Sequence, residues 1–354
     1  MRPLIQSLVG LLALAGLFGC GEEQDRPSQI DSFRILAVRS DSPFASPGAR
    51  PTLEMLTYDG SPAAPRPIHT LWIGGCLNPE GDLYYHCYPA LHRTLAALSD
   101  ADLSAEQVPS GVPDGSIGFG TAFNAVIPAD AITSRPRGSG VVYPYGVLFL
   151  FYAACAGELR HVPGANPATD YPVGCYRPGT SQALGQDDFE FGYYPIYVYE
   201  TLVNHNPVIS SLGFDVAASG AACTADIGCG PDQVCGGQGV CIPAVAACSA
   251  KEAKDCPGYA LGPSVDRSSV ELALSALILE SRAPAETLWV SYYSTGGLFD
   301  KDTRLINEPS AGWSGSYEGV WRPQVGGGRE VSLFAVVRDN RGGVAWARQD
   351  VWVK

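Results

Sequence analysis

A succession of short segments rich in Val, Ile, Leu, Phe and Tyr limits the fold of this chain more strongly than its length or charge does. These side chains suit the half-buried surface of a β-sheet, and Gly and Pro mark the turns between strands. The 354 residues include 41 Gly and 28 Pro, which fits many short strands joined by turns. The sequence therefore predicts a mostly β protein that is long enough for two ordinary domains.

One segment departs from this pattern. Between residues 91 and 107, apolar side chains recur at helical spacing, as at Leu91, Leu95 and Leu98. We expect one or two short helical turns there, within a long insertion of the first domain. The alternative is a solvated loop.

The strand-like segments occur twice in the same order. TLWI at 70–73 has a counterpart in TLWV at 287–290, and each follows an earlier strand and precedes a strongly apolar one. The segment 269–280 also fits a helix, because its apolar residues alternate only at first, but we interpret it as a strand. In chain order the segments are 33–39, 52–58, 70–73, 146–155 and 191–200, then 206–215, 269–280, 287–290, 331–339 and 343–354.

This order resembles that of an immunoglobulin-like β-sandwich, in which a Trp of the third strand packs between the two sheets. Trp72 and Trp289 hold that position in the two halves. The resemblance implies two such sandwiches, domain 1 over residues 32–203 with long insertions and domain 2 over residues 204–354. The junction between them is short and contains a proline, which stiffens it. We therefore expect the two sandwiches to be arranged end to end.

The beginning of the chain has the pattern of an export signal. Met1-Arg2 is a short basic region, and an apolar run follows over residues 4–17. That run is shorter than the ~20 residues that span a bilayer. The next residues are abruptly polar. The four residues LFGC at 17–20 resemble the lipobox of bacterial lipoproteins, although Phe18 is bulkier than the residue usually found there.

The lipobox resemblance implies a signal peptide over residues 1–19 and lipid attached to Cys20. Two or more acyl chains hold a protein stably on a lipid bilayer, at ~0.8 kcal/mol per buried CH₂ group. Residues 20–31 are mostly polar and would form a flexible tether. The alternative is an ordinary secretory signal that leaves Cys20 free.

The remaining cysteines indicate an oxidising compartment. The chain has 11 Cys, and an even number remains when Cys20 is set aside, as disulfide bonding requires. In the immunoglobulin-like arrangement, Cys76 and Cys155 end antiparallel neighbouring strands and lie ~17–20 Å apart, too far for a disulfide, which needs Cα atoms within about 7 Å. We therefore expect local pairs in domain 1. The expected disulfide cysteines are Cys76 with Cys87, Cys155 with Cys175, and Cys223, Cys229, Cys235, Cys241, Cys248 and Cys256 with the pairing open.

Six of these cysteines belong to one segment, residues 221–258, inserted between the first two strands of domain 2. The stretch CTADIGCGPDQVCGGQGVC resembles the short cysteine-rich modules of exported bacterial lipoproteins. It has too little apolar side chain for a core, so crosslinks must hold it. Its wide cysteine spacing disfavours zinc. We expect the insert at the pole of domain 2 away from domain 1, as a recognition element or a tolerated insertion.

The sequence has few signs of catalysis. It contains no G-x-S-x-G, H-E-x-x-H or phosphate-binding loop motif. Two groups of side chains could bind a metal. We interpret the first as a disulfide with two surface histidines, and it consists of Cys76, His86, Cys87 and His92. We interpret the second as a solvated strand edge, and it consists of Asp187, Asp188 and Glu190. We therefore predict a protein that is not an enzyme and requires no metal or cofactor.

A tyrosine-rich loop is the best candidate for binding. Tyr84, Tyr85 and Tyr88 lie close to the expected Cys76–Cys87 disulfide. Held rigidly, they would form a stacking surface for a sugar or a peptide. The alternative is that they cover a small satellite core.

The formal net charge of −13 disfavours nucleic acid and anionic lipid headgroups as partners. As a whole the chain resembles Gram-negative envelope lipoproteins with tandem immunoglobulin-like domains. That resemblance implies an outer-membrane lipoprotein that acts as a non-catalytic binding or scaffolding protein, with an envelope protein or a glycan as partner. One alternative is a subunit of a larger envelope assembly, which predicts a large exposed apolar patch. The other is a hydrolase of envelope polymers, which predicts a deep polar cleft.

Overall fold

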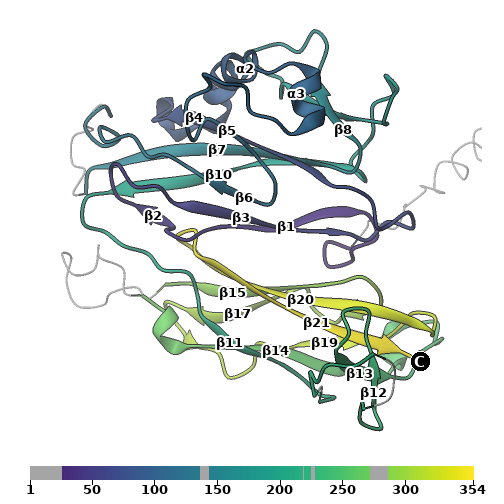
Figure 1. Cartoon of the computed structure of the whole chain (residues 1–354). Coiled ribbons are helices and arrows are strands. Elements are labelled where there is room, and N and C mark those ends of the chain that lie inside the picture. The colour runs from purple at the N-terminus through teal and green to yellow at the C-terminus, as the bar shows by residue number, and fades with distance from the viewer. Residues whose placement is uncertain (1–25, 136–142, 218, 225–227, 272–285) are drawn as a thin grey trace, which may run out of the picture.

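The computed structural model describes residues 26–135, 143–217, 219–224, 228–271 and 286–354. Strands dominate these residues and the helices are short, so the chain is mostly β, as the sequence predicts. The strands of the described residues form five sheets, and four of these stack in layers (Figure 1). No helix among the same residues is long and apolar enough to cross a membrane.

The first β unit contains two sheets that face each other across a core. The three-stranded sheet has the order β1-β3-β6 and the five-stranded sheet the order β2-β10-β7-β4-β5. The strands of the first sheet are β1 (Phe33–Ser40), β3 (Thr52–Asp59) and β6 (Ala122–Asn124). Those of the second are β2 (Phe44–Ala45), β4 (His69–Leu77), β5 (Ile117–Phe119), β7 (Tyr145–Cys155) and β10 (Phe189–Tyr199).

Short helices cover the outer face of the five-stranded sheet (Figure 1). They confirm the helical turns expected within 91–107, and the second of them begins at a capping box between Ser99 and Asp102. A two-stranded sheet lies beside them. The elements are η1 (Glu80–Asp82), η2 (Tyr84–Cys87), α2 (Tyr88–Leu95), α3 (Asp100–Ala105), β8 (Glu158–His161) and β9 (Val173–Tyr176).

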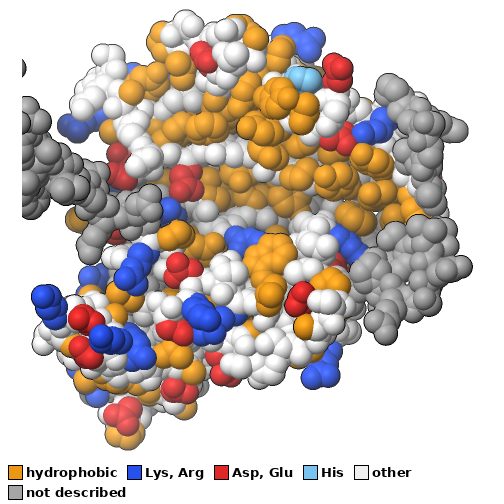
Figure 2. Space-filling view, turned by 180° about the vertical axis from the view of Figure 1, so that it is seen from behind, with side chains coloured by type: hydrophobic (Ala, Val, Ile, Leu, Met, Phe, Trp, Pro, Cys, Tyr) orange, Lys and Arg blue, Asp and Glu red, His pale blue; other side chains and the backbone are white. Residues whose placement is uncertain are grey.

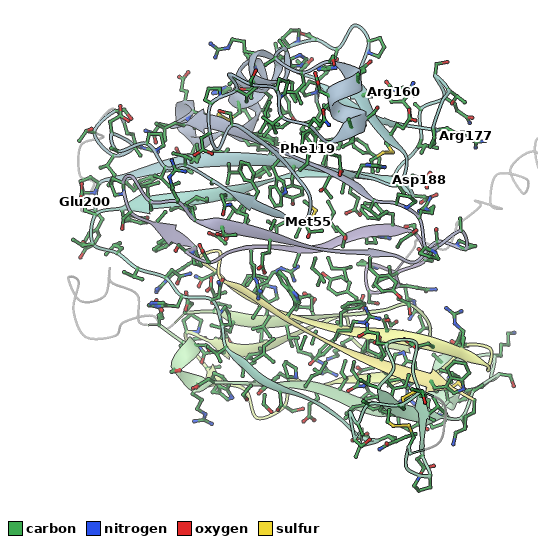
Figure 3. The ribbon with its side chains drawn as sticks, viewed as in Figure 1. Met55, Phe119, Arg160, Arg177, Asp188 and Glu200 are labelled. Atoms are coloured by element: carbon green, nitrogen blue, oxygen red, sulfur yellow. A yellow bond between two sulfur atoms is a disulfide. The ribbon has the colours of Figure 1, made fainter. Side chains whose placement is uncertain are left out.

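Strand β7 is apolar along its whole length because both of its faces are buried. Leu148 and Leu150 point into the core between the two sheets, where Met55 of β3 also lies (Figure 3). Phe149 and Phe151 point to the other side, against the helices. The helices therefore complete a second core on the sheet's outer face, which explains why β7 lacks polar alternation.

The second β unit also has two facing sheets. The four-stranded sheet has the order β11-β14-β19-β16 and the seven-stranded sheet the order β12-β13-β21-β20-β15-β17-β18. The first consists of β11 (Ile209–Phe214), β14 (Tyr259–Val265), β16 (Leu298–Phe299) and β19 (Gly319–Arg322), and η3 (Ala253–Asp255) and η4 (Arg267–Ser269) flank β14. The second consists of β12 (Gln233–Cys235), β13 (Cys241–Val245), β15 (Leu288–Ser294), β17 (Thr303–Glu308), β18 (Gly312–Trp313), β20 (Arg329–Asp339) and β21 (Val344–Val353).

The two units stack face to face, so the expected end-to-end arrangement is wrong. The three-stranded sheet of the first unit lies on the seven-stranded sheet of the second (Figure 1). Leu36 of β1 contacts Phe334 of β20, and Ala37 contacts Val336. Apolar side chains on the outer faces of both sheets drive this contact, because an end-to-end pair would leave them in water.

Residues before β1 belong to this seam. The N–H of Ile30 donates to the carbonyl of Ser294 at 2.8 Å, and the N–H of Ser294 donates to the carbonyl of Ser28 at 2.8 Å. Ser28 and Ile30 are buried. The flexible tether expected over 20–31 therefore does not extend to residue 31, because residues 28–30 are fixed to the second unit.

The two expected core tryptophans have opposite orientations. Trp72 is fully buried between the sheets of the first unit, stacked on Phe123 at 5.7 Å. Trp289 is only half-buried and lines a cleft at the seam, while Trp321 fills the core of the second unit. The expectation for Trp289 is wrong because Leu288 and Val290 face the core there. A shift of one residue reverses the face of every side chain in a strand.

After β11, the first strand that follows the cysteine-rich insert is β14, and the two pair antiparallel. The strand expected at 269–280 falls mostly outside the described residues, and its first residue ends η4.

The cysteine-rich insert is joined to the second unit as part of its large sheet. Its strand β13 pairs in parallel with β21, and the N–H of Gly237 donates to Glu330 at the start of β20. In Figure 1 the insert lies at the same end of the molecule as the first described residues. The end-to-end pair on which the expected position rested is wrong, because the two units lie side by side; in the same view β12 and β13 lie at the edge of the second unit that is away from the first.

All ten cysteines of the described residues form disulfides. Domain 1 contains the two local pairs predicted, because β4 and β7 run antiparallel and place His69, not Cys76, opposite Cys155. The insert contains three further pairs. The bonds are Cys76–Cys87, Cys155–Cys175, Cys223–Cys235, Cys229–Cys241 and Cys248–Cys256.

Candidate functional site

Strand β10 carries a continuous row of aromatic side chains on its outer face. Its sequence FEFGYYPIYVY alternates, and the inward positions Tyr194, Ile196 and Val198 enter the core. At ~3.3 Å per residue, the row extends about 33 Å along the strand. We define the aromatic face as the outward residues of β10 and the tyrosines beside them. These are Phe189, Phe191, Tyr193, Pro195, Tyr197 and Tyr199 with Tyr84, Tyr85, Tyr88 and Tyr171.

Part of this face is unusually exposed. Phe191 is 52% exposed and Tyr193 is 40% exposed, beside the exposed Tyr84 and Tyr85. Figure 2 shows hydrophobic side chains gathered in a broad band across the first unit. Large contiguous apolar patches on soluble proteins mark sites of interaction.

The rings of this face are stacked on one another. Tyr84 stacks on Tyr193 with ring centroids 4.4 Å apart and planes at 17°. Tyr171 stacks on Phe191 at 4.5 Å and 22°. Each stacked ring has one face covered by its neighbour. At most one face of each of these four rings is therefore left for a partner, together with ring edges and the hydroxyl groups of Tyr84 and Tyr193.

The predicted tyrosine loop is part of this surface. The disulfide between Cys76 and Cys87 ties η2 to β4, and Cys87 is fully buried. Tyr84 and Tyr85 are carried on η2 and point outward, whereas Tyr88 packs on the core beneath the helices, where burial raises its pKa. Both interpretations of the loop hold for part of it: two tyrosines form a surface and the third covers a core.

A cleft opens where β10 reaches the seam between the two units. Its volume is about 450 Å³. Aromatic rings from both units form its walls, and the β20–β21 turn closes one side. The lining residues are Phe44, Tyr194, Pro195, Tyr197, Tyr199, Trp289, Asp339, Asn340, Arg341 and Gly342. Sequence reasoning missed this cleft, because it depends on the stacking of the two units.

The rings in the cleft are tilted and not stacked. Phe44 and Tyr199 have centroids 4.9 Å apart with planes at 50°, and Phe44 meets Tyr197 edge-on at 70°. Trp289 is part of no ring contact within the described residues. The ring contacts of Phe44, Tyr197 and Tyr199 in the cleft are therefore tilted or edge-on, whereas the upper part of the aromatic face contains two parallel stacks.

The charged groups behind the cleft are engaged by one another and by backbone N–H groups. Asp339 accepts from the N–H groups of Arg341 at 2.7 Å and Gly343 at 2.8 Å. The guanidinium of Arg341 lies 3.3 Å from Glu286 and 3.7 Å from Glu271. Burial raises the pKa of Asp339, although these hydrogen bonds lower it in part. Burial, together with the Asp339 carboxylate, raises the pKa of Glu286 to about 7.

The buried Glu286 should make stability depend on pH. Its pKa is about 7 in the folded chain and about 4.5 without burial, so the folded state binds more protons between those values, and stability falls as pH rises through that window. The shift corresponds to roughly 3 kcal/mol at ~1.4 kcal/mol per pKa unit. We expect Glu286→Gln to reduce the fall in unfolding free energy between about pH 5 and about pH 8, measured by urea denaturation.

Glu271→Gln is the matched control for this prediction. It makes the same substitution beside the same Arg341, at a side chain that is 22% exposed and not fully buried. Its pH profile should change less than that of Glu286→Gln, because the Glu271 charge is the smallest of the causes that raise the pKa of Glu286. Parallel profiles for Glu286→Gln and the parent would contradict the prediction.

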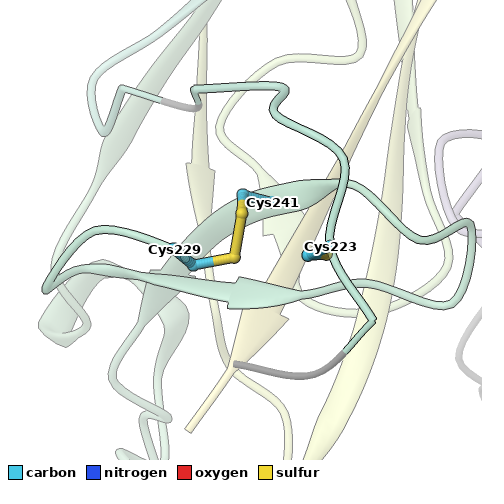
Figure 4. A group of neighbouring side chains, drawn as sticks. All are labelled: Cys223, Cys229 and Cys241. Carbon is cyan, nitrogen blue, oxygen red and sulfur yellow. A yellow bond between two sulfur atoms is a disulfide. The ribbon is translucent and has the colours of Figure 1, made fainter. Parts of the chain in front are cut away.

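A group of sulfurs in the insert has the proximity of a metal site. The Sγ atoms of Cys223, Cys229 and Cys241 lie within 4.8 Å of one another (Figure 4). Cys229 is bonded to Cys241, and Cys223 is bonded to Cys235. Thiolates, not disulfide sulfurs, are the metal ligands, so this arrangement is a disulfide framework.

The other sequence candidates have structural partners. His86 contacts the carbonyl of Glu80 at 3.1 Å, and His92 contacts that of Asp170 at 3.0 Å. The acidic group at the start of β10 is not a solvated edge throughout. Asp188 (Figure 3) pairs with Arg66, and Glu190 accepts from the N–H of Ile35 at 2.6 Å. Cys20 lies outside the described residues.

Comparison with known proteins identifies no family. No family model matches the chain, and no curated protein matches it. It is similar to Escherichia coli alpha-2-macroglobulin activated by porcine elastase, at 9% identity and a TM-score of 0.19, over 93% of this chain and 22% of that one. It is also similar to dimeric latent PorU from Porphyromonas gingivalis, at 10% identity and a TM-score of 0.15, over 95% and 21%. The chain spans about a fifth of the length of these proteins, and neither likeness bears on its function.

Proposed function

We propose that this protein is a non-catalytic binding lipoprotein of the Gram-negative envelope, anchored through Cys20, and that its aromatic face docks on a partner protein. The lipobox-like LFGC sequence supports the anchor. We also propose that each β unit is an immunoglobulin-like sandwich. The facing sheets of each unit and Trp72 between the sheets of the first support this assignment.

The exposed aromatic face is the observation that carries the proposal. Tyrosine is enriched at protein interfaces because it combines a large rigid ring with a hydrogen-bonding hydroxyl. The face is held by a disulfide and by stacked rings, so little conformational entropy remains to be lost on binding. A preassembled tyrosine-rich surface of this kind suits recognition of another folded protein.

A glycan is the less favoured partner for this face. Sugar rings pack against the open faces of aromatic rings. The stacking of Tyr84 on Tyr193 and of Tyr171 on Phe191 covers one face of each ring. The edges and hydroxyls that remain fit the mixed side chains of a protein interface better.

Non-catalytic binding is favoured by how the acidic groups near the cleft are arranged. Asp339, Glu271 and Glu286 are engaged by N–H groups or by Arg341 within the described residues. A hydrolase would need such carboxylates to converge on an open space where a substrate bond could lie.

Crosslinking in the native envelope tests the docking proposal. We expect a photoreactive residue at position 193 to capture a discrete protein partner. Phe191→Ser and Tyr84→Ala should each reduce capture about tenfold or more, the effect of removing an interface hot spot. Both positions are exposed, so the fold should persist.

The matched control is Leu305→Ser on β17, which also removes an exposed apolar side chain but lies on the second unit. Its capture should equal that of the parent. Capture of glycan without protein at position 193, or equal loss of capture in Leu305→Ser, would contradict the proposal.

A further inference from the structure

From the cleft between the two units we infer a binding site for a neutral sugar ring. The cleft is defined by its walls, Phe44, Tyr197, Tyr199 and Trp289, and by the β20–β21 turn. Its volume of about 450 Å³ falls in the range of small-molecule sites, about 300–1,000 Å³. Tyr197 and Tyr199 belong to both the aromatic face and the cleft, whereas Trp289 and Asn340 belong to the cleft alone, so variants at the latter two positions test the sugar site separately.

The ring geometry favours a ligand that packs flat against an aromatic wall. Phe44 is tilted by 50° against Tyr199 and by 70° against Tyr197. Tyr145 is tilted by 35° and 50° against the same two tyrosines, so none of these contacts is a parallel stack. Trp289 adds a large ring from the opposite unit. An aliphatic ring face with C–H groups fills such a wall without losing hydrogen bonds.

The uncommitted polar groups of the cleft suit hydroxyl groups. Within the described residues, the hydroxyls of Tyr197 and Tyr199, the indole N–H of Trp289 and the amide NH₂ of Asn340 have no hydrogen-bond partner. The Asn340 side chain is fixed through its oxygen, which accepts from the N–H of Thr287 at 3.2 Å. Donors that surround an apolar wall are the arrangement that orients a polyhydroxylated ligand.

The charge balance favours a neutral ligand. Both oxygens of Asp339 accept hydrogen bonds, the second from the amide of Asn204 at 3.2 Å. Arg341 is held between Glu271 and Glu286. No uncompensated cation among the lining residues remains to bind an anionic group. A neutral saccharide meets all of these conditions.

Calorimetric titration of the full chain tests the site. The probes are glucose, N-acetylglucosamine, cellobiose and chitobiose as neutral sugars, with glucuronate and choline as charged comparisons. We expect saturable binding of at least one neutral sugar at millimolar concentration or below. Trp289→Ala should weaken it about tenfold or more.

Two further variants separate binding from folding. Trp289→Phe keeps an apolar ring at the seam and should weaken binding by a smaller factor while preserving thermal stability. Asn340→Asp keeps the oxygen that accepts from Thr287 but removes the NH₂ donor, so it should weaken binding several-fold. Phe191→Ser on the aromatic face should leave sugar binding unchanged, so failure of the docking proposal and failure of this inference are distinguishable.

Three outcomes would overturn the inference. These are no binding heat with any of the four neutral sugars, tighter binding of glucuronate or choline than of every neutral sugar, or unchanged affinity in both Trp289→Ala and Asn340→Asp.

Discussion

Replacing Phe334 by alanine should lower the free energy of unfolding by about 3–5 kcal/mol, the usual cost of deleting a buried phenylalanine. Phe334 is 1% exposed and lies at the seam between the two units, where it contacts Ile30 and Leu36. Tyr58 of the first unit packs edge-on against its ring at 5.3 Å. The substitution therefore opens a cavity between the units and not within either core.

The same variant should also uncouple the two units. We expect the parent to unfold in one transition in guanidinium chloride and Phe334→Ala to unfold in two, because the seam links the stability of both units. Tryptophan fluorescence and circular dichroism would record the transitions. Phe191→Ala is the matched control, since it makes the same change at an exposed ring and should cost about 0.5 kcal/mol or less. Equal effects of the two substitutions would contradict the face-to-face arrangement.

Deleting residues 221–258 should destabilise the second unit by at least about 4 kcal/mol. The deletion removes β13, whose residues Ile242, Ala244 and Val245 are buried. Full burial of a single Ile or Val side chain contributes about 1.5–3 kcal/mol. The loss also uncovers the edge of β21, and exposed strand edges pair with other chains. We expect the variant to aggregate, as measured by size-exclusion chromatography and denaturant unfolding.

The two chain ends left by this deletion can be joined directly. Aggregation or loss of stability in the variant would therefore not result from a gap too wide to bridge. Strands β11 and β14 are antiparallel neighbours, and the N–H of Asp215 donates to the carbonyl of Ala260. The control is the double variant Cys248→Ala and Cys256→Ala, which keeps β13 and removes one crosslink. Its cost should be about 2–3 kcal/mol. A monomeric deletion variant with the stability of the parent would show that the insert is dispensable.

The strands of this protein could be predicted because their apolar side chains indicate which residues are buried. The strongly apolar run at 146–155 predicts a strand, and the structure buries both faces of β7 there. The local disulfides Cys76–Cys87 and Cys155–Cys175 could be predicted from the antiparallel order of β4 and β7. Short-range patterns and the pairing of adjacent strands could therefore be predicted from the sequence.

The sequence of strand β20 indicates that the units stack. Its residues 331–337 read VSLFAVV, and apolar side chains occupy both odd and even positions. Val331, Leu333 and Ala335 face the core of the second unit, while Phe334 and Val336 face the first unit. A strand with one face in water would alternate with polar residues. This run therefore indicated a second apolar layer above the sheet.

Two features could not be predicted, because one depends on strand register and the other on contacts between residues that are far apart in the chain. The TLW repeats look alike, but Trp72 points into a core and Trp289 points out of one, a difference that four residues do not encode. The cleft unites Phe44, Tyr199, Trp289 and Asn340, which only the packing of the two units places together. The aromatic face was closer to prediction, since alternate positions of β10 are all aromatic or proline.

The seam has a consequence for the order in which the chain is made. Leu36 and Leu56 of the first unit are synthesised early, but Phe334 and Val336, which cover them, follow about 300 residues later. Ser294 likewise reaches Ile30 only after the whole first unit exists. In the large sheet, β21 lies between β13 and β20, both made before it. A nascent chain therefore presents an uncovered apolar layer and two open strand edges until its last strand is available, and surfaces of this kind are prone to aggregation during that interval.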